Sequence, residues 1–512
     1  MHTQTADRDW PKLQKAFSVT TNDIPTLDSI RSRVRFLAGF KPERYDCCVK
    51  TCCCFTGPLK NLNHCPHCNE ARYASDGRPR KSFTYLPFIP RLLAFLANKS
   101  IAETLLYRAN FSPSTDGSRS DIFDGNHYRR LLQQHISVNG KHLSKTYFSD
   151  PRDVALGLST DGFAVFKKRK QTAWPLLVFL YNLPPDQRFL IQNILSLGVI
   201  PGPNKPKDFD SFLWPFAQEM LRLACGEKAF DGCTLKAFIL RAFLIIIFGD
   251  IPAISALMRM KGHNGLSPCR MCEIVAVPVV GNSRNNTHYT PLDRSSHPKV
   301  IASHQAAEGK PLVQKYDPGN LPLRTHAKML EQAQEVQLAP TQVAAEELAK
   351  VYGIKGVSIL FHLASVEFPV SFPFDFMHVV WENVIKSLIL LWTGDFKGLD
   401  VGSGSYQLSL PVWQAIGAAT TAAGKTIPAA YGPRLPNIAT TDQNYCTADM
   451  WSFWTLYLGP ILLHRQFSNQ RYYKHFIDLV RLLNICLKFE ITTSDIEVLD
   501  TGFQKWVEKY EQ

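Results

Sequence analysis

The stretch that decides the fold is Ala242-Phe-Leu-Ile-Ile-Ile-Phe-Gly-Asp250, an apolar run that ends on a carboxylate. Short runs of this kind, rich in β-branched and aromatic residues, are typical of buried strands. An upstream segment, Leu156-Gly-Leu-Ser-Thr-Asp161, has the same form of an apolar strand followed by aspartate. Two carboxylates at strand ends can meet at one edge of a sheet and hold divalent metal. Phosphodiester chemistry with two metal ions requires that arrangement.

The segments around these two aspartates predict an α/β core. In chain order, three strands, an amphipathic helix and a fourth strand are expected at Val154–Thr160, Trp174–Tyr181, Leu195–Ile200, Asp210–Cys225 and Ala237–Phe248. This is the order of a ribonuclease-H-like core, in which the first and fourth strands are central and adjacent. In that topology Asp161 and Asp250 would lie side by side.

The composition indicates a globular chain of several domains with an anionic partner. The 512 residues are 45% hydrophobic and 20% charged, and their formal net charge is +13. Nucleic acid is the commonest partner of so basic a protein, and a basic but otherwise ordinary enzyme is the alternative. The polar N-terminus predicts no signal peptide, and Arg241 interrupts the longest apolar run. We therefore expect a soluble, intracellular protein without a membrane span.

Thirteen cysteines in such a chain indicate metal sites or free thiols rather than disulfides. The pairs Cys48-Val-Lys-Thr-Cys52 and Cys65-Pro-His-Cys68 are close in sequence. Tetrahedral zinc takes four thiolates that tight turns deliver in pairs, so this block predicts an N-terminal zinc module. Three further cysteines could replace a member of the first pair: Cys47, Cys53 and Cys54.

A second pair, Cys269-Arg-Met-Cys272, stands alone. A structural zinc there needs two more ligands, and histidine is the most suitable type. The candidates are His263, His362 and His378. The alternative is a turn with two unpaired cysteines.

Two clusters of basic residues, one of them mixed with aromatic residues, bear on nucleic-acid binding. Lys167, Lys168, Arg169 and Lys170 follow the first strand and predict a phosphate contact, with a solvated hairpin turn or a nuclear-import signal as alternatives. Tyr472-Tyr-Lys-His-Phe476 mixes aromatic and basic residues. Its helical spacing favours a place in the core over a stacking platform for bases.

The remaining segments divide the chain into expected regions. Gly398–Pro436 is rich in Gly, Ala and Pro and is expected to be irregular, whereas the sequence after it is expected to be helical. The expected division, in chain order, is a peripheral segment (1–40), the cysteine-rich zinc module (41–75), a helical linker region (76–150), the first part of the core (151–275), an insertion that is loop and then helix (276–360), the helix region of the third acid (361–395) and a mostly helical C-terminal region (396–512).

Many short motifs occur here in one order. They are Gly157-Leu-Ser-Thr-Asp161-Gly-Phe163, Tyr181-Asn-Leu-Pro-Pro185, Ile200-Pro-Gly-Pro203, Gly249-Asp250-Ile-Pro-Ala253, Cys269-Arg-Met-Cys272 and Asp375-Phe-Met-His378. With the N-terminal cysteines they resemble the transposases of CACTA (En/Spm-type) DNA transposons, particularly fungal members, over roughly residues 45 to 510.

The resemblance implies a DDE/D ribonuclease-H-like catalytic core and cut-and-paste DNA transposition. The implied partners are the terminal repeats of the transposon and target DNA, bound in the nucleus by a homo-oligomer within a synaptic complex. The implied cofactors are catalytic Mg²⁺ or Mn²⁺ and structural Zn²⁺.

The resemblance also assigns residue roles. Asp161 is the first catalytic acid and Asp250 the second, and Glu382 is the preferred third acid because it lies on the helix expected after His378. Many relatives carry another residue at the position of Glu382, so Asp449 and Asp375 stay as rivals. His378 is the preferred zinc partner of Cys269 and Cys272.

Two other readings of the function remain open. One is a domesticated or decayed transposase that binds DNA without cutting it, and the other is a scaffold in which zinc only folds the chain. Metal dependence separates the last of these from the enzyme, because a scaffold needs zinc alone whereas turnover also needs Mg²⁺ or Mn²⁺.

Overall fold

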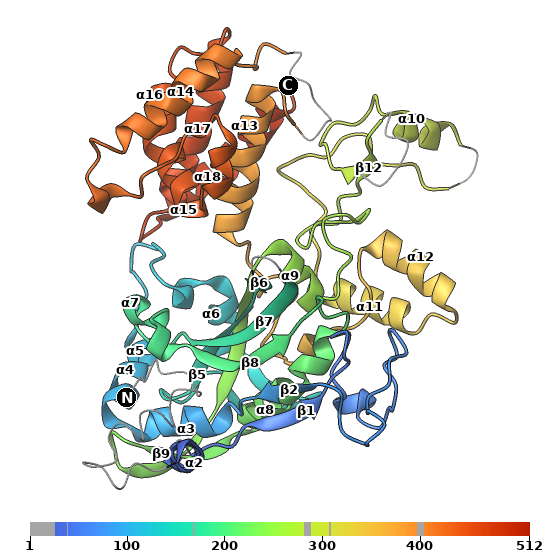
Figure 1. Cartoon of the computed structure of the whole chain (residues 1–512), viewed down its shortest axis with the longest axis vertical. Helices are drawn as coiled ribbons and strands as arrows, with labels where there is room; N and C mark the ends of the chain where they lie inside the picture. Colours follow the sequence, from blue (N-terminus) through green and yellow to red (C-terminus); the bar gives the residue numbers. More distant parts are fainter. Residues whose placement is uncertain (1–25, 38, 167–168, 281–287, 307–308, 397–403) are drawn as a thin grey trace. The chain divides into compact units, whose positions relative to one another are not determined.

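The computed structural model describes residues 26–37, 39–166, 169–280, 288–306, 309–396 and 404–512. The chain forms two compact units, each assembled from segments that are distant in sequence (Figure 1). Unit 1 comprises residues 1–110, 135–244 and 362–365. Unit 2 comprises residues 111–134, 245–361 and 366–512.

A five-stranded sheet organises unit 1. Its strands are β5 (Val154–Thr160), β6 (Phe163–Phe166), β7 (Arg169–Leu180), β8 (Leu195–Pro201) and β11 (Ala242–Phe248), the last of which begins in unit 1. The order is β11-β5-β7-β6, and β8 also pairs with β7. β5, β6 and β8 all pair with β7 in antiparallel fashion. The predicted adjacency of the first and fourth core strands is therefore confirmed.

The fourth strand is shorter than predicted. The prediction of one continuous strand over Ala237–Phe248 is wrong, because β10 (Lys236–Leu240) forms a separate antiparallel hairpin with β9 (Glu227–Asp231). Arg241 divides the two, and its carbonyl accepts a hydrogen bond of 2.9 Å from the Val154 N–H at the start of β5. β10 alternates between exposed and buried residues, whereas β11 is buried almost throughout, so only β11 suits the interior of the larger sheet.

Helices and short strands complete unit 1. They are α2 (Leu27–Leu37), α3 (Ile89–Ala97), α4 (Lys99–Leu105), α5 (Tyr107–Asn110), α7 (Pro185–Arg188), α8 (Phe209–Cys225), the pair β1 (Glu43–Asp46) and β2 (Ser82–Tyr85), and the pair β3 (His135–Val138) and β4 (Lys141–Thr146). α8 confirms the predicted amphipathic helix. Its Phe212 and Phe216 pack edge-on against Phe83 and Phe88, with ring centroids 5.5 and 5.8 Å apart.

Unit 2 is mainly helical. Its helices are α6 (Asn126–Leu132), α9 (Ile251–Leu257), α10 (Pro298–Gln305), α11 (His326–Gln337), α12 (Gln342–Tyr352), the π-helix η6 (Met377–Ile385), α13 (Lys386–Thr393), α14 (Leu410–Ala423), α15 (Ala448–Phe453), the π-helix η9 (Trp454–Leu458), α16 (Gly459–Leu462), α17 (Gln470–Cys486) and α18 (Thr493–Tyr510). The C-terminal helices, orange to red in Figure 1, share a core rich in tryptophan that includes Trp392, Trp413 and Trp454. The helical C-terminal region is thus confirmed.

Two segments of unit 2 are more regular than the sequence predicted. The stretch Gly398–Pro436, which was expected to be irregular, contains α14. Packing supports this helix, and its Gly417 lies so close to Asn437 that an added Cβ atom would be 2.1 Å from the Asn437 Oδ1 atom. The expected long loop after residue 275 contains α10 and a short pair of strands, β12 (Val277–Pro278) and β13 (His288–Tyr289). Glycine and alanine permit close contacts between a helix and its neighbours, but their low hydrophobicity gives no pattern from which such a helix can be predicted.

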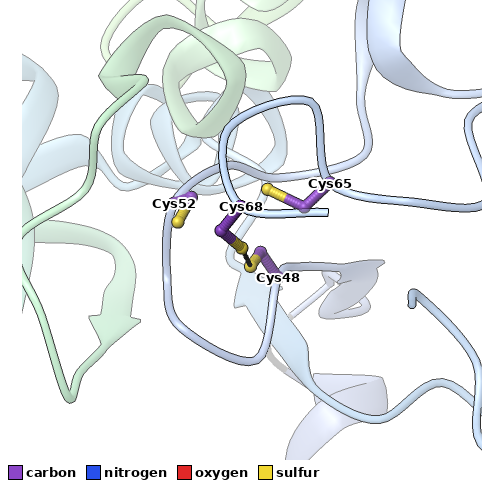
Figure 2. A group of neighbouring side chains, drawn as sticks. All are labelled: Cys48, Cys52, Cys65 and Cys68. Atoms are coloured by element: carbon purple, nitrogen blue, oxygen red, sulfur yellow. Dashed lines mark hydrogen bonds between the residues drawn. The ribbon is translucent and has the colours of Figure 1, made fainter. Parts of the chain in front are cut away.

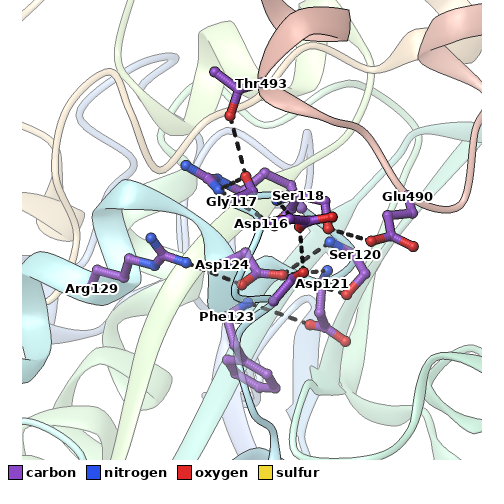
Figure 3. A network of polar contacts seen from close by, with 12 residues as sticks. Asp116, Gly117, Ser118, Ser120, Asp121, Phe123, Asp124, Arg129, Glu490 and Thr493 are labelled. Carbon is purple, nitrogen blue, oxygen red and sulfur yellow. Dashed lines mark hydrogen bonds and ion pairs between the residues drawn. The ribbon is translucent and has the colours of Figure 1, made fainter.

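A polar network ties the segment Ser112–Gly125 to the segment before α18 (Figure 3). Arg119 and Ile491 exchange backbone hydrogen bonds of 2.7 and 2.9 Å, and the Ser118 hydroxyl donates to Glu490. Asp124 is fully buried and forms an ion pair of 3.2 Å with Arg129. The segment Ser112–Gly125 is therefore anchored at its middle and near its C-terminal end.

The helices in the described ranges are all too short or too polar to cross a membrane.

Candidate functional site

The predicted N-terminal cysteines converge in unit 1. The Sγ atoms of Cys48, Cys52, Cys65 and Cys68 all lie within 4.8 Å of one another (Figure 2). The sulfurs of Cys48 and Cys68 are 3.4 Å apart. Four thiolates around zinc, each at about 2.3 Å, stand about 3.8 Å from one another, so this set has the spacing of a structural zinc site.

Tight turns present the two cysteine pairs. The Thr51 N–H donates to the Cys48 carbonyl at 2.7 Å, and Thr51 itself has a φ of +65°. In the second pair, the Asn69 N–H donates to the Cys65 carbonyl at 2.9 Å, and Asn69 has a φ of +57°. Each turn reverses the chain between its two cysteines, so both thiols of a pair point to the same side.

Burial and crowding of the thiols favour a bound cation. Burial raises the pKa of Cys52, and the neighbouring Cys68 and Cys48 thiols raise it further. A divalent metal would offset both effects, because it stabilises the thiolates against each other.

Cys53 comes within 3.8 Å of the Cys65 sulfur, and the Cys54 thiol donates to the Asp46 carbonyl at 3.4 Å. Neither belongs to the four-cysteine group found within the described residues.

The cysteine module is attached to the start of α8. The backbone N–H groups of Lys207 and Asp208 donate to the Cys52 carbonyl at 3.1 and 2.9 Å. The Cys54 N–H donates to the Ser211 hydroxyl at 2.9 Å. A metal held by the four thiols would thus stabilise the packing of this module on α8.

The second cysteine pair also forms a compact turn, in unit 2. The pKa of Cys269 is lowered to about 6, because the Cys272 thiol and the N–H groups of Cys272 and Met271 donate to its sulfur, although burial opposes them. The buried Arg324 guanidinium donates to the carbonyls of Cys269 at 3.0 Å and Cys272 at 3.2 Å. The turn therefore presents one thiolate in an electropositive setting, which suits a metal ligand.

Asp375 holds the side chain of His378. Its Nδ1 atom lies 2.9 Å from the Asp375 Oδ2 atom, and its N–H donates to Oδ1 at 3.2 Å. In the part of the chain that the structure describes, His378 does not join Cys269 and Cys272 in a group of three or more close ligand atoms. Their joint binding of zinc stays a prediction.

Asp161 and Asp250 both follow a strand, as predicted. Asp161 comes directly after β5 in unit 1 and is exposed. Asp250 follows β11 in unit 2 and caps α9, since its Oδ1 atom accepts a 2.5 Å hydrogen bond from the Ala253 N–H. This cap fixes the direction of the carboxylate.

The preferred third acid lies on a π-helix. Glu382 is part of η6, and its carboxylate is 3.6 Å from the Lys386 ammonium group. π-Helical turns are frequent at functional sites. No pattern in the sequence predicts where they form. Of the rivals, Asp375 is occupied with His378, and Asp449 lies in the first turn of α15.

Two members of the basic cluster lie on β7. Lys167 and Lys168 lie outside the described residues, whereas Arg169 and Lys170 belong to β7. Phe166 is the register partner of Arg169 across the hairpin. Whether the cluster contacts phosphate therefore stays a prediction.

The central part of the chain resembles a known protein family. Residues 133–304 match the family model described as Transposase family tnp2. The matched span is about a third of the chain and includes Asp161, Asp250, Cys269 and Cys272. The tnp2 family is the En/Spm-type transposase family, so the match supports a transposase-related function. The search of curated proteins gives no match.

Proposed function

We propose that this protein is a DNA transposase that cleaves at the terminal repeats of a transposon and joins the freed ends to target DNA. The match to the tnp2 family carries the proposal. The net charge of +13 agrees with a nucleic-acid partner. We also propose that the protein acts in the nucleus as a homo-oligomer within a synaptic complex.

Three carboxylates are proposed as the catalytic acids: Asp161, Asp250 and Glu382. Their oxygen atoms suit Mg²⁺ or Mn²⁺, which prefer hard donors. Two such ions would supply an activated water or 3′-hydroxyl nucleophile and stabilise the leaving oxygen of an in-line displacement. Asp161 is exposed and Asp250 is only half-buried, so both can be approached by ions and by a phosphate.

The chain's own groups position these acids. The α9 cap engages the Oδ1 atom of Asp250, and within the described residues its Oδ2 atom has no hydrogen-bond partner. This oxygen is the one that we propose as a metal ligand. The basic cluster of Lys167, Lys168, Arg169 and Lys170 is proposed to screen the phosphates of the bound DNA.

Zinc is proposed in a structural role. The four-cysteine cluster has the ligand type and spacing for it. We propose a second zinc at Cys269 and Cys272 with His378 as a further ligand. Asp375 would act there as the carboxylate that orients the histidine ring, a common arrangement around zinc.

The test is cleavage by purified protein with Mn²⁺ on DNA that carries the terminal repeats of the encoding element. Asp161→Asn and Asp250→Asn should each lower the cleavage rate by more than about a hundredfold while DNA affinity stays unchanged. Asp186→Asn, which alters an exposed aspartate at the start of α7, is the matched control and should cut normally.

Each other outcome has a definite meaning. Normal cleavage by Asp161→Asn would show that the assigned acid is wrong. DNA binding without cleavage by the unaltered protein would favour the decayed or domesticated transposase. A protein that needs zinc for stability but binds no DNA would be the scaffold.

A further inference from the structure

A pocket of about 740 Å³ lies within the helical C-terminal region of unit 2. α13, α17, the end of α18 and the segment 404–406 line it. Leu388 and Trp392 contribute buried apolar surface, whereas Arg471 and Lys509 contribute positive charge. The volume is within the range of about 300–1,000 Å³ that is usual for small organic ligands.

Aromatic rings form part of the pocket lining. Tyr406 and Tyr472 meet edge to face with ring centroids 5.8 Å apart. The Tyr472 hydroxyl is held by the Ser405 hydroxyl at 3.1 Å and also accepts from Arg471. Tyr510 is 43% exposed and stacks on Trp506 with centroids 5.6 Å apart. Flat rings fixed in this way can stack on a planar ligand at little entropic cost.

Arg471 places a cation beside these rings. Its guanidinium carbon is 4.6 Å from the centre of the Tyr472 ring. Within the described residues no carboxylate pairs with Arg471, whereas Lys509 pairs with Asp478 at 2.9 Å. Glu511 also lines the pocket, but its carboxylate accepts from the N–H groups of Leu292 and Asp293 at 2.6 and 3.1 Å. Arg471 is therefore the cation best placed for an anionic group of a ligand.

Two residues of the pocket, Tyr472 and His475, come from the mixed aromatic and basic motif at 472–476. The sequence favoured a core position for the whole motif, and this holds for Phe476, which is fully buried. Tyr473 donates its hydroxyl to the Pro460 carbonyl at 2.8 Å. Tyr472 and His475, however, line the pocket. One face of α17 thus belongs to the core and an adjoining face belongs to the pocket.

We propose that this pocket binds one unpaired nucleotide, with the base against the Tyr472 ring and the phosphate at Arg471. The inference rests on the proposed function, which supplies DNA as the partner. Stacking on aromatic side chains is the usual way in which proteins hold unpaired bases, and a guanidinium matches a phosphate in a bidentate manner. The nucleotide can come from a DNA strand or from a free mononucleotide, and the test separates the two.

The experiment compares binding of the full chain to two DNA ligands. One is the terminal-repeat duplex, and the other is the same duplex with a short single-stranded 3′ extension that carries 2-aminopurine. The extension should raise affinity and quench the fluorescence of 2-aminopurine. Arg471→Gln and Tyr472→Ala should each lower affinity for the extended DNA by about tenfold and leave duplex binding unchanged.

Two controls isolate the pocket. Lys474→Gln removes one positive charge from an exposed position on the same helix, so it should leave the preference for extended DNA intact. Tyr472→Phe keeps the ring, so it should retain most of the quenching even if Tyr472→Ala lowers the thermal stability. Deoxynucleoside monophosphates are added at millimolar concentration as competitors in a separate arm.

The outcomes separate the two proposals. Equal affinity of the unaltered protein for both DNA ligands would overturn the pocket proposal and leave the proposed function in place. No binding to either DNA would overturn both. Mononucleotides that bind in an Arg471-dependent manner, without any preference for extended DNA, would assign the pocket to free nucleotides and overturn its role on DNA.

Discussion

Glu219 is a buried carboxylate of α8 that organises the start of α3. The N–H groups of Phe88 and Ile89 donate to it at 2.8 Å each, and the Tyr85 hydroxyl donates as well. It thus serves as the N-terminal cap that α3 does not obtain from its own side chains. A single glutamate joins β2, α3 and α8.

We expect Glu219→Ala to destabilise the protein by about 3 kcal/mol, because two buried N–H groups and one hydroxyl lose their acceptor. Urea unfolding measures this change. Glu103→Ala on α4 is the matched control, since the Glu103 side chain is exposed and its ion pair with Lys99 spans 3.9 Å. That control should change stability by less than about 0.5 kcal/mol. Equal effects of both variants would contradict the capping role.

Asp153 is a second buried acid, and it opposes folding at neutral pH. Burial raises its pKa to about 6, although Arg108 and Arg241 act in the other direction. Its Oδ1 atom has no hydrogen-bond partner within the described residues. Between the unfolded pKa of about 4 and the folded pKa of about 6, the folded state binds more protons, so stability falls as pH rises through this window.

Asp153→Asn removes this charge. We expect the variant to be about 1–2 kcal/mol more stable than the unaltered protein at pH 7.5 and nearly equal to it at pH 4. Urea unfolding at the two pH values gives the difference. The same gain at both pH values would show that titration of Asp153 is not its source.

Among the elements, the cysteine module is the one whose fold is expected to depend on metal. Its turns are short, and their N–H and carbonyl groups bind one another and the start of α8. Zinc would join turns that have little apolar surface of their own.

We expect the purified protein to contain zinc at Cys48, Cys52, Cys65 and Cys68. Cys65→Ser should lower the zinc content by one atom per chain and lower the thermal midpoint by several degrees, because the site is left with three thiolates. Metal analysis and thermal unfolding measure both effects. Cys225→Ser, at an exposed cysteine outside the cluster, is the control and should change neither. An unaltered zinc content in Cys65→Ser would refute the site.

The turn at Cys269 and Cys272 is tested by the same metal analysis. If His378 and the two cysteines bind zinc, Cys272→Ser and His378→Ala should each remove one further atom per chain. Asp375→Asn should weaken this site without abolishing it, because it alters the group that orients the His378 ring. Full zinc content in Cys272→Ser would exclude a second site there.

For the whole molecule, the net charge of +13 sets the expected mode of DNA binding. Lysine and arginine side chains that contact phosphates release counterions, so affinity falls as salt rises. With about six contacts or more, affinity for any duplex should fall by about a thousandfold between roughly 50 and 200 mM salt. Fluorescence anisotropy with terminal-repeat and unrelated duplexes measures the two slopes, and affinity that does not depend on salt would contradict this mode.

Local pattern in the sequence was enough to predict several elements. Apolar runs of strand length predicted β5, β7, β8 and β11, and the amphipathic spacing over Asp210–Cys225 predicted α8. The spacing of the four N-terminal cysteines predicted the cluster that the structure brings together. These features depend on side-chain type and on short spacing, and both are present in the chain before it folds.

Tertiary packing alone decided the rest. Arg241 separates β10 from β11, and its carbonyl accepts a hydrogen bond from the N–H of Val154 in β5, a contact between residues far apart in sequence. α14 forms from a segment rich in glycine and alanine, because its small residues allow close approach to neighbouring chain. The π-helical turn that carries Glu382 and the division of the 472–476 motif between core and pocket have the same origin. Each of these features depends on which surfaces from distant parts of the sequence pack together. The composition and periodicity of the sequence do not predict that packing.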